Sequence, residues 1–313
     1  MRQLLRLAAV AGALLPAAPA HADKGLVVAL YLPDTPLSLQ QLADLGESLA
    51  RQLASALGTS VVARSYRKDD DFATVLRDGT ADLALCEPLL VAARALRVVG
   101  VATRAGPPDG ERTTTQLALY GARPLLGLLA GRGSSTDHPL RLAGVRSTRH
   151  RQLVQRVLLE GDPGAARALQ WLAAPDVLSS LEVVRSGRAD IAMAPFGMRG
   201  APAGLLAHPL GAPVPNPALV ALSPRAIALE DRLRAVLPQL RLDGPLSGLR
   251  AGTARPYQAL AAELAGEAPG QHRVALLPNP RPPMPTFSPS AHAPLGPARV
   301  SLPLPPAGAL VGF

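Results

Sequence analysis

Two segments of the sequence share a pattern that strongly constrains the fold. Residues 75–84 read Val-Leu-Arg-Asp-Gly-Thr-Ala-Asp-Leu-Ala, and residues 183–192 read Val-Val-Arg-Ser-Gly-Arg-Ala-Asp-Ile-Ala. Each passes from a helical apolar pattern through a helix-ending glycine into a short apolar run typical of a buried strand. The recurrence predicts two similar lobes, each with an α/β layer, and a cleft between lobes is a favoured place for a small ligand. Because any α/β protein contains such joints, this pattern alone leaves a single-lobed fold open.

The composition argues against nucleic-acid binding despite a basic balance. The formal charge is +9 and the pI is near 10.8, but Lys24 and Lys68 are the only lysines and the arginines are scattered. Aromatic residues make up 3% of the chain, too few for a base-stacking platform. What remains is a weak general preference for anionic partners.

The N-terminus is typical of a secretory signal peptide. Arg2 and Arg6 precede the apolar run 7–15, and Ala20-His21-Ala22 matches an A-x-A cleavage site. We therefore expect residues 1–22 to be removed and the mature protein to be periplasmic. No later run is long enough to predict a membrane span, and the single cysteine, Cys86, excludes an intrachain disulfide.

After the signal peptide, strands alternate with helices, as in a parallel sheet covered by helices. The helix predicted at 39–57 has an N-cap at Ser38, leucines at helical spacing and a stop at Gly58. The segment 195–217 is predicted to be a loop that returns to the first lobe, and residues 267–313 are predicted to be a proline-rich disordered tail. Strands are expected at 26–32, 60–66, 82–86, 98–103, 125–130, 140–145, 191–194 and 219–222.

The order of these signals resembles the type II periplasmic solute-binding proteins, in particular the branch that binds phosphate, phosphite and phosphonates. The resemblance covers residues 24–265 and rests on short motifs taken in order. They are Leu30-Tyr31-Leu32-Pro33, the helix 49–58 ending in Leu-Gly, the strand 61–66 with its tyrosine, the joints 79–85 and 187–193, and Pro215-Asn-Pro-Ala-Leu-Val220.

The resemblance implies a two-lobed type II periplasmic-binding-protein fold, with a mostly parallel sheet flanked by helices in each lobe. Lobe 1 would comprise residues 23–104 and 203–266, and lobe 2 residues 105–202. The implied function is a non-enzymatic receptor that closes on a small anionic, phosphonate-like or phosphate-like solute by hinge motion. Its partner would be an ABC permease or a membrane sensor. We expect a monomer without stable membrane insertion, cofactor or metal.

The segment after the strand 140–145 is the first candidate site. Ser147 and Thr148 would offer hydroxyls and backbone N–H groups to an anion at a helix start, or act as ordinary N-caps. The family's glycine-containing Ser-x-Ser-Gly loop is replaced here by Arg146-Ser-Thr-Arg-His150. Arg149 and His150 would add charge-assisted bonds to a carboxylate or sulfonate, or be solvated residues of the helix start.

Four further candidates lie at strand ends. By family analogy Tyr31 is expected in the cleft, with a core or rim position as the alternative; Tyr66 ends the next strand. Glu87 follows a strand directly and would accept from an amine or a protonated phosphonate, or serve as a helix N-terminal carboxylate. Pro195 is expected at the cleft end of a second-lobe strand.

Two other functions are consistent with the residues. One is a binding-protein fold retained as a protein-interaction scaffold without a ligand. The other is an exported enzyme that uses Cys86 and a histidine, although Cys86 lies in an apolar strand and the common catalytic motifs are absent.

Overall fold

The computed structural model describes residues 25–106, 110–124, 139–146, 148–154, 169–198, 200–210 and 213–265. All of these residues fall within one compact unit. The predicted signal peptide, the strand 125–130, Ser147 and the proline-rich tail lie outside the described residues. Within the described part, no helix combines the length and apolar content that a membrane crossing requires.

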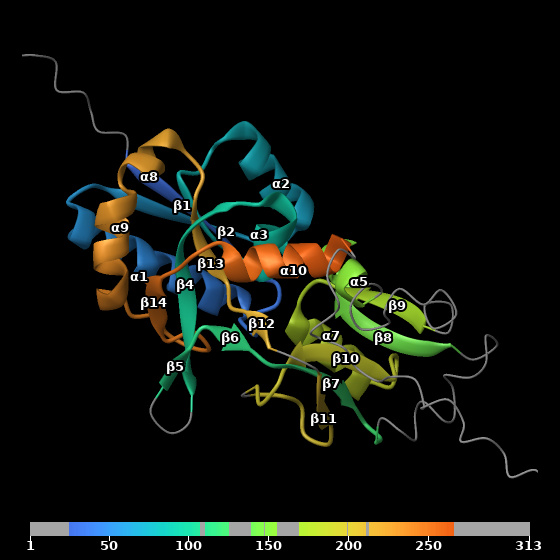
Figure 1. The fold of residues 1–313 in the computed structure, drawn as a ribbon. Helices are drawn as coiled ribbons and strands as arrows, with labels where there is room; N and C mark the ends of the chain where they lie inside the picture. Colours follow the sequence, from blue (N-terminus) through green and yellow to red (C-terminus); the bar gives the residue numbers. More distant parts are fainter. Residues whose placement is uncertain are drawn as a thin grey trace, which may run out of the picture. The chain divides into compact units, whose positions relative to one another are not determined.

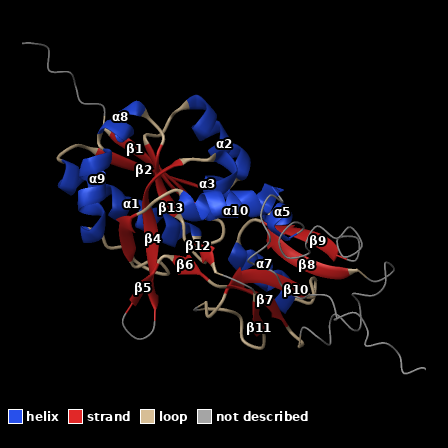
Figure 2. Ribbon diagram, viewed as in Figure 1, coloured by secondary structure: helices blue, strands red, loops and turns tan. Residues whose placement is uncertain are grey.

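The first sheet is built from both ends of the chain (Figures 1 and 2). Its strand order is β14-β4-β13-β3-β1-β2, and β5 pairs with β4. The strands are β1 Leu26–Tyr31, β2 Val61–Tyr66, β3 Leu83–Cys86, β4 Arg97–Gly106, β5 Gly110–Arg112, β13 Ala218–Ala221 and β14 Gly248–Ala251. The helices packed with it are α1 Leu39–Leu57, α2 Asp69–Asp78, α3 Pro88–Arg94, α8 Pro224–Ala228, α9 Glu230–Val236, η2 Leu237–Gln239 and α10 Arg255–Ala265.

The second sheet comes from the middle of the chain and has the order β11-β7-β10-β8-β9. Helix α7 packs on β8 and β10. The elements are β7 Leu117–Gly121, β8 Leu140–Val145, α5 Thr148–Gln152, β9 Leu169–Ala174, α7 Val177–Arg185, β10 Ile191–Pro195 and β11 Leu206–Pro209.

The two sheets share one pairing pattern. In the first, β2, β1 and β3 are parallel neighbours, and β13 and β4 follow antiparallel. In the second, β9, β8 and β10 are parallel, and β7 and β11 follow antiparallel. Each sheet is therefore mixed, with a parallel three-stranded part, and the repeat seen in the sequence corresponds to a repeated topology.

The Ala-Asp joints have the same role in both sheets. The N–H of Val27 donates to the Asp82 carboxylate at 2.9 Å, and the N–H of Asp82 donates to the Val27 carbonyl at 2.8 Å. Asp190 makes the same pair with Arg141, at 2.8 and 2.9 Å. Both aspartates thus fix the start of a strand against its parallel neighbour, which is a structural role.

The sequence predicted the bounds of α1 correctly from local signals. Ser38 and Gln41 form a reciprocal capping box, and Gly58 ends the helix with φ +65°. The leucines at helical spacing are buried against the first sheet, including Leu49 and Leu53 at 0% exposure.

The prediction of an unbroken loop at 195–217 is wrong. It contains β11 and a two-residue strand, β12 Val214–Pro215, which pairs antiparallel with β6 Thr114–Thr115. Neither strand shows an alternation of apolar residues that could have predicted it. Each is stabilised instead by backbone pairing with a strand distant in sequence. The β6–β12 pair joins the two crossings between the sheets (Figure 1).

Candidate functional site

A pocket lies where elements of both sheets meet. About 610 Å³ of space lies between the atoms that line it, and this figure includes space open to solvent. Ends of β1, β8 and β10 reach it, as expected for ligand sites at the carboxyl ends of parallel strands. Its polar lining is Asp34, Thr35, Arg104, Thr115 and His150, and its apolar lining is Pro88, Leu89, Leu117, Val145, Leu153, Val177, Met193, Ala194, Pro195, Val214, Pro215 and Pro217.

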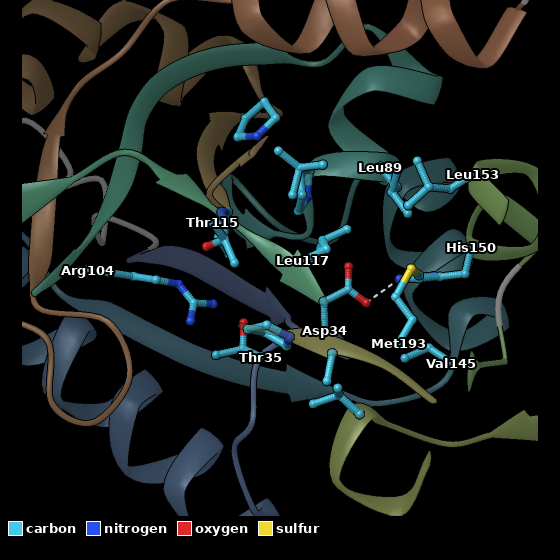
Figure 3. A pocket seen from close by; sticks show the side chains of 17 residues that line it. Asp34, Thr35, Leu89, Arg104, Thr115, Leu117, Val145, His150, Leu153 and Met193 are labelled. Atoms are coloured by element: carbon cyan, nitrogen blue, oxygen red, sulfur yellow. Dashed lines mark ion pairs between the residues drawn. The ribbon is translucent and has the colours of Figure 1, made fainter. Parts of the chain in front are cut away.

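One side of the pocket presents a cation with unused hydrogen-bonding capacity. Figure 3 shows Arg104, from β4, with its guanidinium beside Thr35. Arg104 Nε and Thr35 Oγ1 are inaccessible to solvent, and neither has a hydrogen-bond partner among the described residues. Burial lowers the pKa of Arg104 to about 10, opposed by the charge of Asp34, so the guanidinium stays protonated at neutral pH.

The other side of the pocket holds a buried acid–imidazole cluster. His150, 3% exposed, forms an ion pair through Nε2 with Asp34 (Figure 3), and the same nitrogen lies 3.8 Å from Glu87 Oε2. Glu87 is fully buried. Burial and the neighbouring Asp34 raise the pKa of Glu87 to about 8. Burial alone would lower the pKa of His150, but Asp34 and Glu87 outweigh it and raise that pKa.

Arg149 links this cluster to the first sheet's α2. Its Nε donates to Glu87 Oε1 at 3.1 Å, and its guanidinium also pairs with Asp69. With its side chain 11% exposed, Arg149 is not the solvated helix-start residue that one alternative described. Glu87 occupies the N-cap position of α3, as the helix N-terminal alternative described, but its side chain makes no capping hydrogen bond.

The two tyrosines lie away from the pocket lining. Tyr31 is 1% exposed and stacks on Phe72 with ring centroids 5.0 Å apart. Burial, helped by the charge of Glu87, raises its pKa, so the hydroxyl stays neutral. Tyr66 packs edge-on against the same ring and borders a second, smaller hollow with Arg67.

The structure brings together only some of the predicted site residues. His150 and Pro195 line the pocket, and Glu87 and Arg149 lie directly behind it. Thr148 begins α5, but its side chain, like all of Ser147, lies outside what the structure describes.

Sequence reasoning missed Asp34 and Arg104. Asp34 lies in the Pro-Asp-Thr-Pro segment just after the first apolar strand, which is close to the kind of position that selected Glu87. Arg104 is a charged residue directly after the apolar run 98–103. An arginine at the end of a buried strand could therefore have been recognised as a candidate site residue.

The alternative of a cysteine nucleophile has little support. Cys86 is fully buried, and burial together with the charge of Glu87 raises its pKa. The thiolate that such chemistry requires is therefore disfavoured.

Comparison with solved structures shows the fold. PhnD1 from Prochlorococcus marinus, in complex with methylphosphonate, superposes with a TM-score of 0.56 at 12% identity, over 78% of this chain and 98% of that one. The binding-protein component of an ABC phosphonate transporter from Pseudomonas aeruginosa gives 0.56 at 14% identity, over 78% and 87%. XAC2383 from Xanthomonas citri, bound to chloride, gives 0.55 at 19% identity, over 77% and 98%.

No protein-family model and no curated protein matches the chain. The solved structures nonetheless confirm the predicted two-lobed fold of type II periplasmic binding proteins, and the resemblance to the phosphonate-binding branch holds at the level of that fold.

Proposed function

We propose that this chain, which has the type II periplasmic-binding-protein fold, is an exported receptor for a small solute that carries an anionic group. The solute would be bound in the pocket between the two sheets and delivered to an ABC permease or presented to a membrane sensor. The proposal rests on the fold shared with transporter binding components and on the chemistry of the pocket.

The proposal rests mainly on the buried guanidinium of Arg104. A guanidinium whose Nε is inaccessible to solvent and unpartnered within the described residues is costly unless an anion completes its hydrogen bonds. Thr35 Oγ1, also unpartnered among those residues and on the same wall, would supply a further donor. A tetrahedral oxyanion or a carboxylate matches this pair, because an arginine binds two oxygens side by side.

The apolar lining favours a solute with a carbon substituent over bare phosphate. Leu89, Leu117, Leu153 and Met193 would contact an alkyl group, while Arg104 binds the charged end. An alkylphosphonate combines these features, in agreement with the methylphosphonate named for the P. marinus protein. Here a side-chain cation would replace the glycine-containing loop that this sequence lacks. Ser147 and Thr148, proposed from sequence alone, would be additional donors.

The arrangement also supports closure by hinge motion. The β6–β12 pair joins the two crossings between the sheets, where small dihedral changes would move one sheet against the other. The lobe boundaries proposed from sequence, 23–104 with 203–266 and 105–202, lie near these crossings, although β5 pairs with the first sheet and β11 with the second. Bridges between elements of the two sheets would hold the closed form: Arg149 to Asp69 and His150 to Asp34. Export would use the signal peptide predicted at residues 1–22.

The test is a thermal-shift screen of the mature protein with methylphosphonate, phosphate, phosphite, ethanesulfonate and succinate. A solute present at about 100 times its Kd stabilises the fold by about 2.7 kcal/mol, which corresponds to a rise of roughly 5–10 °C in Tm for a protein of this size. We expect such a rise with at least one of the five anions, and the largest with methylphosphonate.

Substitutions of two arginines in β4 test whether Arg104 binds the anion. Arg104→Gln should abolish the rise. Arg97→Gln, which changes an exposed arginine of β4 paired with Glu230 at 2.7 Å, should preserve it. A folded wild-type protein that responds to none of the anions would refute the proposal and favour the scaffold function. An Arg104→Gln variant that responds like the wild type would exclude this pocket as the anion site.

A further inference from the structure

We propose that Asp34, Glu87 and His150 form a binding site for a divalent transition-metal ion of the zinc class. The three residues come from separate elements: the turn after β1, the end of β3 and helix α5. One donor atom of each lies within 4.8 Å of the donor atoms of the other two. Chain segments distant in sequence therefore place one imidazole nitrogen and two carboxylate oxygens around a common point.

Glu87 gives the independent sign that a ligand belongs there. Its side chain is 0% exposed, Oε1 accepts from Arg149, and Oε2, the oxygen nearest His150, has no hydrogen-bond partner among the described residues. A buried carboxylate oxygen without a partner is costly. An ion bound between Oε2 and the imidazole would satisfy it.

The charge balance also favours a bound cation. The cationic side chain nearest Glu87 is Arg149, whose charge is shared with Asp69. With a neutral imidazole, the three carboxylates of Asp34, Glu87 and Asp69 face the guanidiniums of Arg149 and, beside Asp34, Arg104, so one net negative charge remains, which favours a bound cation.

The donor set and its surroundings suit zinc. One imidazole and two carboxylates occur at sites that leave a coordination position open, and zinc binds more tightly than manganese or iron(II) to such nitrogen and oxygen ligands. Arg149 at Oε1 acts as the outer partner that orients the Glu87 carboxylate. Because Asp34 and His150 line the pocket, the open position would face the solute.

The proposal goes beyond the proposed function and is tested without any solute. The mature protein, stripped with EDTA and dialysed, is titrated with zinc chloride by calorimetry, and bound zinc is counted by mass spectrometry after equilibrium dialysis. We expect one zinc per chain with a Kd in the micromolar range or tighter. Cobalt chloride should give the visible absorption of a protein-bound Co²⁺ ion, a readout that does not depend on a stability change.

Variants localise the ion. Asp34→Asn and His150→Gln should each weaken zinc binding at least tenfold, whereas His208→Gln, on β11 of the second sheet, should bind like the wild type. Far-UV circular dichroism identifies variants that have lost the fold, and in that event the conservative Glu87→Gln replaces them.

A wild-type protein that binds less than one zinc per five chains, or equal zinc affinity in the wild type and in folded Asp34→Asn and His150→Gln, would overturn the metal site. Repeating the anion screen with EDTA separates the two proposals. Solute binding that persists without zinc leaves the receptor function intact even if the metal site fails.

Discussion

Asn216 is expected to hold together the two chain crossings between the sheets. It is 0% exposed. Its Nδ2 donates to the carbonyl of Ala102 at 2.9 Å and to that of Arg112 at 2.8 Å, and its Oδ1 accepts from Thr115 Oγ1 at 2.5 Å. One side chain on the second crossing is thus bonded to Thr115 of β6 on the first crossing and to β4 and β5 of the first sheet, beside the β6–β12 pair.

The substitution Asn216→Ala removes all three bonds. Buried hydrogen bonds contribute roughly 0.5–1.5 kcal/mol each, and more where a partner is left unsatisfied, so we expect a loss of about 3 kcal/mol in the free energy of unfolding. With a urea m-value of about 2–3 kcal/mol/M, the midpoint should fall by about 1 M. The assay is urea unfolding followed by far-UV circular dichroism at neutral pH.

Two further variants separate hydrogen bonding from packing. Thr115→Val removes one of the three bonds and should cost about 1 kcal/mol. Asn216→Asp keeps the volume but places a carboxylate against two carbonyls, so it should destabilise at least as much as Asn216→Ala. A loss below about 1 kcal/mol for Asn216→Ala, or a harmless Asn216→Asp, would refute the assignment of Asn216 as the link between the crossings.

Two other predictions concern the core and the repeated joints. Asp82→Ala and Asp190→Ala each remove a bond from a backbone N–H to a carboxylate and should each cost about 1.5–3 kcal/mol by urea unfolding, with nearly additive effects because they lie in different sheets. A double variant much less stable than the sum would show that the sheets are coupled. In α1, Leu53→Ala should cost about 2–5 kcal/mol, whereas Leu39→Ala, 60% exposed, should stay within about 0.5 kcal/mol. Equal thermal shifts for these two leucine variants would contradict the proposed packing face.

The sequence predicted the parts of the fold that depend on local signals. The helix from Ser38 to Gly58 carries its own cap, apolar face and stop, and the two Gly-x-Ala-Asp joints each carry a turn and a strand start. Strands such as β11 and β12 escaped prediction because they are stabilised by backbone pairing with distant segments and leave no periodic pattern in their own residues.

The residues of the candidate site likewise fall into two groups, those that the sequence predicted and those that only the structure revealed. Position after an apolar strand was enough to select Glu87, His150 and Pro195, since parallel strands bring their carboxyl ends to one edge. The sequence by itself therefore determined the duplicated α/β architecture and the edge at which polar residues gather. Only the tertiary structure decided that Arg104 and Asp34 face the pocket, and that Tyr31 is enclosed against Phe72. Those outcomes depend on which distant segments pack together. Tyr31 and Phe72 are 41 residues apart, and the pocket lining runs from Asp34 to Pro217, separations over which local propensity carries no information.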